Sequence, residues 1–188
     1  ASMLHLTRES VIIHDMIPFY YHEHFPDYLN KLENFYIMRR LKASARKADD
    51  VITISEASKQ DIMKYAHVSG DDIIVIPNGY NAVAKKEFAK PDAAYIMAVT
   101  SALPHKNAEG IVKSYEKYCH MTDSPLPLTI VGIDDCSAFT SDSLTMKNIT
   151  CIRYVEKNED FHQLIYGASV FLFLSLIEGF GFPPIEAM

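Results

Sequence analysis

The 188-residue sequence is poor in several residue types, and each shortage excludes a class of protein. It has three cysteines and no tryptophan. Cys119, Cys136 and Cys151 lie 17 and 15 residues apart and form no Cys-x-x-Cys pair. An odd number of cysteines at this spacing excludes a disulfide framework and an ordinary zinc site. We interpret the three cysteines as buried thiols in a reducing compartment.

Positive charge and long apolar runs are scarce as well. Eighteen Lys and Arg residues stand against 24 Asp and Glu residues, and the net charge of −6 argues against a general attraction to nucleic acid. No stretch approaches the roughly 20 apolar residues of a membrane-spanning helix, and the N-terminus lacks the layout of a signal peptide. We therefore expect a cytoplasmic protein, whose 48% hydrophobic content is ample for a core.

Strand and helix signals alternate along the chain. Apolar runs predict short strands at 11–15, 51–54, 72–77, 94–100, 126–132, 149–152 and 168–177. Periodic or capped segments predict helices at 28–49, 56–66, 107–120, 158–167 and from 184 onward. This alternation predicts an α/β protein with a doubly wound parallel sheet in each half. The polar, irregular segment 81–92 separates the halves, which gives domains at 1–80 and 81–188.

The predicted helix 28–49 has two notable features. Apolar residues recur at helical spacing and predict an amphipathic helix, namely Leu32, Tyr36, Leu41, Ala45 and Ala48. A basic run follows at 39–47, in a chain that is otherwise acidic. The run is either a solvated helix face or an interfacial helix that draws the protein to anionic lipid.

The segment from Glu178 to Glu186 is the most informative about function. A predicted buried strand ends at Glu178, and the next residues are Gly-Phe-Gly-Phe-Pro-Pro and then Ile185 and Glu186. The prolines suit the first turn of a helix, and ligands in open α/β sheets bind at the carboxyl ends of strands, near helix N-termini. Two carboxylates with exposed amides between them suit a ligand that carries hydroxyls and phosphates, such as a nucleotide sugar.

This segment and four others resemble motifs of glycosyltransferase family 4, whose members are retaining enzymes with the GT-B fold. The four are His14–Pro18, Thr53–Ser58, Ile76–Gly79 and Pro104–Asn107, and all five occur in the family's order. The resemblance covers nearly the whole chain. It implies a GT-B type architecture of two Rossmann-like parallel-sheet domains, both incomplete here. Residues 1–80 correspond to the later part of the acceptor-side domain, and residues 81–188 to the nucleotide-sugar-binding part of the second.

The same resemblance implies roles for single residues. Glu178 contacts the donor sugar, Glu186 accepts the ribose hydroxyls, Lys106 binds the diphosphate, His14 positions the sugar, and Val155 lies at the base. Each role has a structural alternative: a solvated loop carboxylate for Glu178, compensation of the helix dipole in the first helical turn for Glu186, a surface ammonium for Lys106 and a structural imidazole for His14.

Further donor contacts and departures from the family pattern surround these positions. The amides of Phe180, Gly181 and Phe182 are expected to face sugar or phosphate oxygens, while both phenyl rings are expected in the core. His105 shares the phosphate charge when it is protonated, and Ser175 either donates to phosphate or caps a strand. A common diphosphate-binding arginine of the family is replaced, six residues before the lysine, by Thr100.

The resulting functional hypothesis is a retaining glycosyltransferase. It would move a mannose-, glucose- or rhamnose-like hexose from a nucleoside-diphosphate sugar to a glycan or lipid-linked acceptor in cell-surface polysaccharide synthesis. No cofactor and no metal are expected, because Lys106 and helix-terminal amides would neutralise the diphosphate. Two alternatives remain open: a nucleotide-sugar-binding module without turnover, and another GT-B enzyme such as a sugar epimerase.

Overall fold

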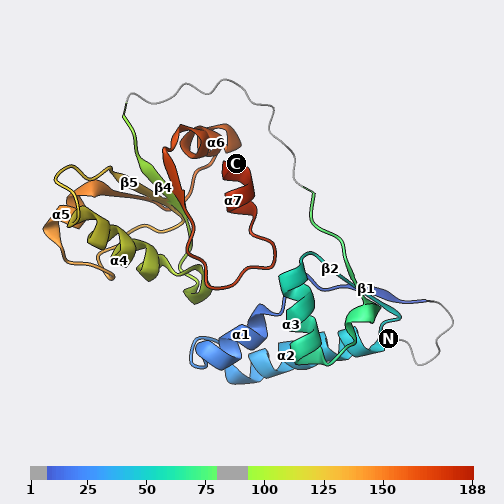
Figure 1. Cartoon of the computed structure of the whole chain (residues 1–188). Helices are drawn as coiled ribbons and strands as arrows, with labels where there is room; N and C mark the ends of the chain where they lie inside the picture. Colours follow the sequence, from blue (N-terminus) through green and yellow to red (C-terminus); the bar gives the residue numbers. More distant parts are fainter. Residues whose placement is uncertain (1–7, 80–92) are drawn as a thin grey trace. The chain divides into compact units, whose positions relative to one another are not determined.

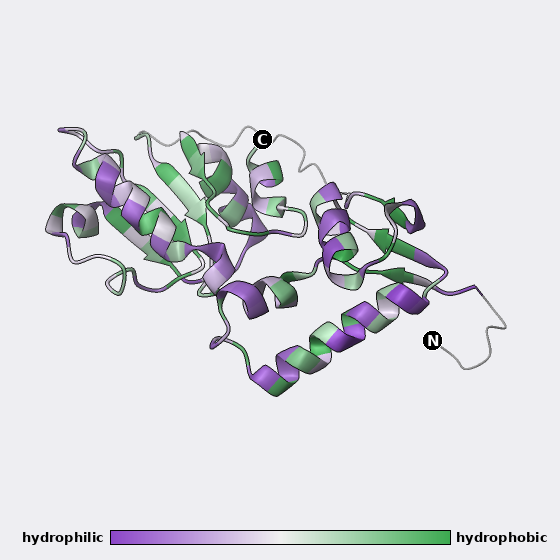
Figure 2. Cartoon of the chain, turned by 60° about the horizontal axis from the view of Figure 1, so that its bottom comes forward, coloured by the Kyte–Doolittle hydropathy of each residue, from purple (hydrophilic) through white to green (hydrophobic). Residues whose placement is uncertain are grey.

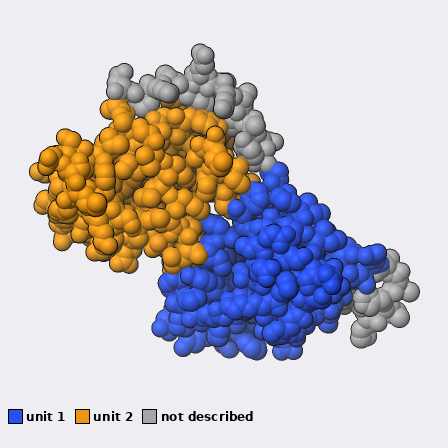
Figure 3. Space-filling view, viewed as in Figure 1, with its two compact units in different colours: residues 1–80, 177–180 blue, residues 81–176, 181–188 orange. Residues whose placement is uncertain are grey.

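The structure, a computed structural model, describes residues 8–79 and 93–188. The chain divides into two compact units (Figure 3). Unit 1 comprises Ala1–Tyr80 and Ile177–Phe180, and unit 2 comprises Asn81–Leu176 and Gly181–Met188. The predicted boundary segment 81–92 lies outside the described residues. Each unit contains its own parallel sheet, as the alternation of elements predicts.

Unit 1 is built on three parallel strands in the order β1-β2-β3, and Figure 1 labels the first two of them. These are β1 (Ser10–Ile12), β2 (Asp50–Thr53) and β3 (Ile73–Val75), with Val11 beside Val51 and Val51 beside Ile73. Side chains of one sheet face form a core with three helices, which are α1 (Ile17–His24), α2 (Lys31–Lys47) and α3 (Glu56–Ala66). The other face carries exposed isoleucines, which are Ile12, Ile74 and Ile76.

The buried stripe of α2 differs from the predicted one. Leu32 and Tyr36 are 81% and 60% exposed, so the prediction of an apolar inner face is wrong for the first half of the helix. The side chains that face the core are instead spaced by three or four residues, and the first of them is polar. They are Asn34, Met38, Leu41, Ala45 and Ala48. As a result, hydrophilic and hydrophobic bands alternate along the long helix of Figure 2.

Unit 2 is a four-stranded parallel sheet in the order β6-β5-β4-β7. The strands are β4 (Ile96–Val99), β5 (Leu128–Val131), β6 (Ile149–Ile152) and β7 (Val170–Leu172). Alternate side chains point to opposite faces: Ala98 packs with α4 (Ala108–Cys119), and Met97 packs with α6 (Asn158–Gly167). The edge strands are β6 and β7, and Val170 of β7 is 48% exposed.

Several elements differ from those predicted from the sequence. The predicted buried strand 168–177 is wrong in length, because main-chain groups after Leu172 bond to a loop and not to a strand. The final helix, α7 (Phe182–Ala187), begins before Pro184. Four short elements were not predicted, which are α1, α5 (Ser143–Asn148), η1 (Gly70–Asp72) and η2 (Pro104–Lys106).

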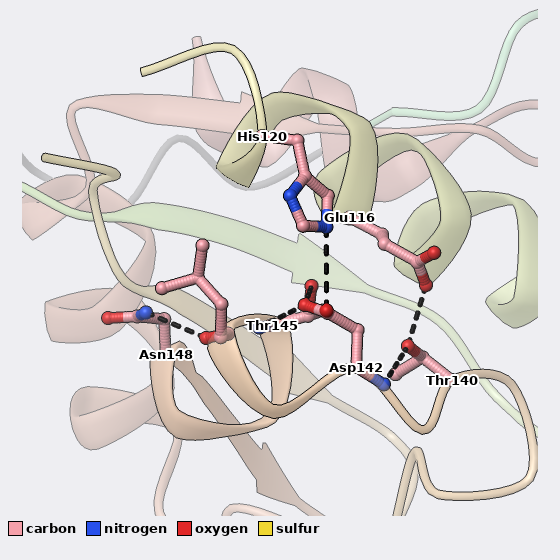
Figure 4. A network of polar contacts seen from close by, with 7 residues as sticks. Glu116, His120, Thr140, Asp142, Thr145 and Asn148 are labelled. Atoms are coloured by element: carbon pink, nitrogen blue, oxygen red, sulfur yellow. Dashed lines mark hydrogen bonds and ion pairs between the residues drawn. The ribbon is translucent and has the colours of Figure 1, made fainter. Parts of the chain in front are cut away.

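A polar network joins the end of α4 to the start of α5 (Figure 4). Asp142 caps α5 by accepting from the amide and the hydroxyl of Thr145 at 2.8 and 2.7 Å, and His120 Nε2 lies 3.4 Å from its other oxygen. These contacts, the Thr145 hydrogen bonds first, hold the pKa of the Asp142 carboxyl below its usual value. Thr140 links this cap to Glu116 through a 2.6 Å hydrogen bond.

A helix must be both long and apolar to span a membrane. Across residues 8–79 and 93–188, no helix is both long and apolar enough to span a bilayer.

Candidate functional site

Polar residues of unit 1 gather where β1 and β2 end. His14 and Asp15 follow β1, and Ser55 follows β2, so neighbouring parallel strands bring them to one edge of the sheet. The hydroxyl of Thr53 donates to the Ile13 carbonyl at 2.8 Å and fixes the end of β1. The carboxylate of Asp15 accepts from the amide of Ile17 at 3.0 Å. Asp15 therefore supports the start of α1.

The segment that carries Glu178 lies against this edge, within unit 1. The carbonyl of Gly179 accepts from the hydroxyl of Ser55 at 2.6 Å and from that of Ser58 at 3.3 Å. The same Ser58 hydroxyl lies 2.8 Å from the carbonyl of His14. A Cβ at Gly179 would lie only 3.2 Å from that carbonyl. Gly179, the residue that follows Glu178, therefore lies against the main chain of His14.

Ser55 and Ser58 are the residues that sequence reasoning missed. Ser55 caps α3, because its hydroxyl oxygen accepts from the Ser58 amide at 3.0 Å. Its bond to Gly179 spans 124 positions of sequence. A Ser-x-x-Ser pattern at a helix start signals capping, and nothing local to it reveals the distant carbonyl.

In unit 2 the loop before α4 carries Lys106. Its last residue, Asn107, has a left-handed backbone with φ of 55° and caps α4 by accepting from Gly110 at 3.1 Å. The side-chain amide of Asn107 also donates to Leu174 at 2.9 Å, and the His105 carbonyl accepts from Leu176 at 2.8 Å. The stretch on both sides of Ser175 is therefore tied to the lysine loop.

Thr100 holds the other end of this loop. Its hydroxyl donates to the Lys106 carbonyl at 3.0 Å, and its amide donates to Val131 at 2.9 Å. Gly132, the residue after β5, has a φ of +113°, and a Cβ there would lie 1.8 Å from the carbonyl oxygen of Thr100. Only glycine fits this approach. The replacement of the family's arginine by Thr100 thus comes with a structural role for the threonine.

Three predicted donor residues have surroundings that the sequence did not indicate. His105 is only 5% exposed, so its imidazole lies in the interior of unit 2. Phe182 is 40% exposed, so the expectation of a core position for its ring is wrong. Glu186 is the fifth residue of α7 and not in its first turn, because the helix begins at Phe182 after the left-handed Gly181. Dipole compensation in the first turn therefore does not explain Glu186.

Val155 and the end of α7 meet on a small cluster of unit 2. Val155 and Ala187 are both partly buried against Met97, Val131 and Ile165. Val155, which was predicted to lie at the nucleotide base, and α7, which carries Glu186, therefore pack on the same apolar cluster.

The predicted site residues fall into two sets. Unit 1 brings His14 to the segment of Glu178, and unit 2 brings Lys106 and His105 to the segment of Ser175. Among the residues that the structure describes, no group of three or more His, Cys, Asp or Glu side chains could hold a metal ion.

Comparison with solved structures defines the class of fold. The chain is similar to the crystal structure of TarM with a TM-score of 0.61 and 19% identity, over 96% of this chain and 34% of that one. It is similar to the lipopolysaccharide outer core galactosyltransferase WaaB with a TM-score of 0.54 and 23% identity, over 80% and 44%. These neighbours are GT-B glycosyltransferases, and the predicted GT-B fold class is confirmed.

Sequence comparison then gives the family. "Glycosyltransferase Family 4" matches residues 5–83, and "Glycosyl transferases group 1" matches residues 79–188. The chain belongs to the glycosyl transferases group 1 family. It is 31% identical to the O-antigen chain mannosyltransferase RfbU of Salmonella typhimurium, over 97% of this chain. It is 24% identical to the serotype-specific mannosyltransferase WbdA of Escherichia coli, over 94%. The chain spans 50% of RfbU and 24% of WbdA.

Proposed function

We propose that this chain forms the donor-binding part of a retaining hexosyltransferase that builds a cell-surface polysaccharide. The donor would be a nucleoside-diphosphate sugar, and the acceptor a glycan or a lipid-linked glycan. The names of RfbU and WbdA favour mannose among the hexoses. The carrying observation lies within unit 2, where hydrogen bonds from Asn107 to Leu174 and from Leu176 to His105 tie the Lys106 loop to the stretch around Ser175.

Each proposed donor-site residue contacts a different part of the nucleotide sugar. In this proposal Lys106 neutralises the diphosphate, Glu186 accepts the ribose hydroxyls, and Glu178 and His14 position the sugar. The loop hydrogen bonds from Thr100 and Asn107 support the role of Lys106, because they fix its main chain before any ligand arrives. Convergence of the two sets of residues on one ligand is part of the proposal.

The proposed reaction needs neither a metal nor a protein nucleophile. The acceptor hydroxyl attacks the anomeric carbon from the face that the diphosphate leaves, and a leaving-group oxygen takes the hydroxyl proton. The anomeric configuration is thereby retained. Lys106 would supply the charge stabilisation that a divalent ion supplies in other enzymes.

The location is proposed as well. We infer a cytoplasmic enzyme whose basic run 39–47 contacts the inner face of the membrane, where a lipid-linked acceptor would be found. The charge of the run supports this, because it stands in a chain with a net charge of −6.

Thermal shift with nucleoside diphosphates and their sugars tests the donor assignment. A ligand at about 100 times its Kd should stabilise the chain by about 2.7 kcal/mol. Lys106→Ala should remove most of this shift, whereas Lys113→Ala, a surface control on α4, should retain it. Equal shifts in both variants, or no shift with any nucleotide, would contradict the donor site.

A further inference from the structure

Sulfur atoms from three segments of unit 2 gather beside the edge strand β6. Cys136 lies in the loop after β5, Met146 lies on α5, and Cys151 lies in β6. The Cys136 thiol donates to the thioether sulfur of Met146 at 3.7 Å. Cys151 packs in the same core cluster as Cys136, and burial, followed by the neighbouring Cys136 thiol, raises the pKa of the Cys151 thiol to about 12. We call Cys136, Met146 and Cys151 the sulfur cluster.

The main chain around the sulfur cluster is fixed by hydrogen bonds. The carboxylate of Asp135 accepts from the Ser137 amide at 2.9 Å, and the carbonyl of Cys136 accepts from the Phe139 amide at 2.9 Å. Asp142 caps the start of α5. The loop after β5 and the first turn of α5 are therefore held by the protein itself, as a preformed binding site requires.

The spacing of the sulfurs suits a shared metal ion. Thiolate sulfur binds a metal such as zinc at about 2.3 Å, so two sulfurs on one ion lie about 3.8 Å apart in tetrahedral and about 4.0 Å apart in trigonal coordination. The 3.7 Å between the sulfurs of Cys136 and Met146 is close to both values. One ion would therefore bind these two sulfurs with little movement of either side chain.

The sulfur cluster reaches the surface on an acidic side. Cys136 is 3% exposed and Met146 is 36% exposed, so the cluster extends from the core to solvent. The exposed carboxylates of Asp134 and Asp135 both disfavour a negative charge on Cys151. The same two carboxylates favour a cation at this place.

We propose that Cys136, Cys151 and Met146 bind one copper(I) ion. Thiolate and thioether sulfurs are the ligands that copper(I) prefers. A structural zinc ion takes four ligands, and among residues 8–79 and 93–188 no group of three or more His, Cys, Asp or Glu side chains could hold a metal ion. On binding, the two thiols lose their protons to solvent and their sulfurs bond to the ion, while the oxidation state of copper is unchanged. The ion would join the loop after β5, α5 and β6.

Anaerobic titration of the whole chain with copper(I), buffered by a coloured copper(I) chelator, tests the site. One ion should bind per chain. Cys136→Ser and Cys151→Ser should each weaken binding by at least about 100-fold, because loss of even an outer-shell group of a metal site costs about 10- to 100-fold. Cys119→Ser is the matched control and should change binding less than about twofold. Cys119 is a buried thiol of the same core, but its neighbour is Tyr115.

The thioether ligand has a matched test of its own. Met146→Leu nearly conserves side-chain volume, so this variant should remain folded. It should weaken copper(I) binding about tenfold, which corresponds to about 1.4 kcal/mol. Met121→Leu, at a methionine that is 83% exposed, should leave binding unchanged. This pair keeps the proposal testable if a serine variant at a buried cysteine fails to fold, which circular dichroism would reveal.

The wild-type complex gives two more measurements. X-ray absorption should show sulfur ligands at about 2.3 Å, and bound copper(I) should raise the thermal unfolding midpoint of the wild type but not that of Cys151→Ser. Four outcomes would overturn the proposal: no copper(I) binding, oxygen or nitrogen ligands in place of sulfur, equal losses in Cys119→Ser and Cys151→Ser, or zinc binding as tight as copper(I) binding.

Discussion

Replacement of Gly132 by alanine should reduce the stability of unit 2 and displace its Lys106 loop. Gly132 has a φ of +113°, and the new Cβ would lie 1.8 Å from the Thr100 carbonyl oxygen. Carbon and oxygen atoms in contact are normally about 3.3 Å or more apart. The end of β4 and the end of β5 would therefore have to separate by about 1.5 Å, or the backbone would have to leave its left-handed conformation.

The magnitude follows from these two effects. An L-residue at positive φ costs about 1–2 kcal/mol, and forcing extra atoms into a packed interior costs about 1–3 kcal/mol. We expect a loss of about 2–5 kcal/mol in the free energy of unfolding of unit 2. Because Thr100 also holds the Lys106 carbonyl at 3.0 Å, the lysine loop should move with it and nucleotide affinity should fall.

Urea unfolding followed by far-ultraviolet circular dichroism measures the first effect, and titration with nucleoside diphosphate the second. Gly70→Ala is the control, because its Cβ would meet the flexible ends of two side chains, those of Met63 and Lys59, at 3.2 Å from the Met63 sulfur. This control should change stability by less than about 1 kcal/mol. A Gly132→Ala protein with the wild-type urea midpoint would refute the reasoning.

Three more predictions concern ionisation, anchoring and the division of donor contacts. The pKa of Asp142 is lowered in the folded chain, so its charged form stabilises the fold. This stabilisation should be complete above about pH 4 and should disappear as the pH falls through the folded-state pKa. Acid unfolding of Asp142→Asn should lack this pH-dependent loss of stability. Ser55→Ala should cost about 1 kcal/mol through the lost cap, and faster amide exchange at Gly179 would report the lost anchor. Glu186→Ala should weaken nucleoside diphosphate binding, while Glu178→Ala should hardly alter it and reduce discrimination among sugars; calorimetry showing equal losses would contradict this division.

Elements with strong local signals could be predicted from the sequence. The bounds of α3 and α6 match the predicted ranges 56–66 and 158–167, and β6 matches 149–152. In α3 the reason is local: a serine cap, a first-turn Glu56 and helical spacing act within a few residues. The parallel arrangement of both sheets also followed from the alternation of strands and helices.

Other features depend on tertiary contacts and could not be predicted. The apolar residues Leu32 and Tyr36 suggested the inner face of α2, yet the core selects the stripe that includes Asn34. The apolar run after Leu172 leaves the sheet because the loop before α4 takes its hydrogen bonds. Tertiary competition of this kind overrides a local pattern.

The candidate site shows the same limit. Lys106, Glu178 and His14 were selected by their motifs. The hydrogen bonds around them were not, because Ser55 reaches Gly179, Ser58 reaches His14 and Asn107 reaches Leu174, all far away in sequence.

The bond between Ser55 and Gly179 also has a consequence for the order of folding. It closes a chain loop of 124 residues. Closing a flexible loop of this length costs about 4 kcal/mol of entropy more than a contact between adjacent residues. Such a contact becomes favourable only after the intervening chain has become compact. The Glu178 segment should therefore be positioned last, and a nascent or partly folded chain should form its Lys106 loop before the Glu178 carboxylate is in place.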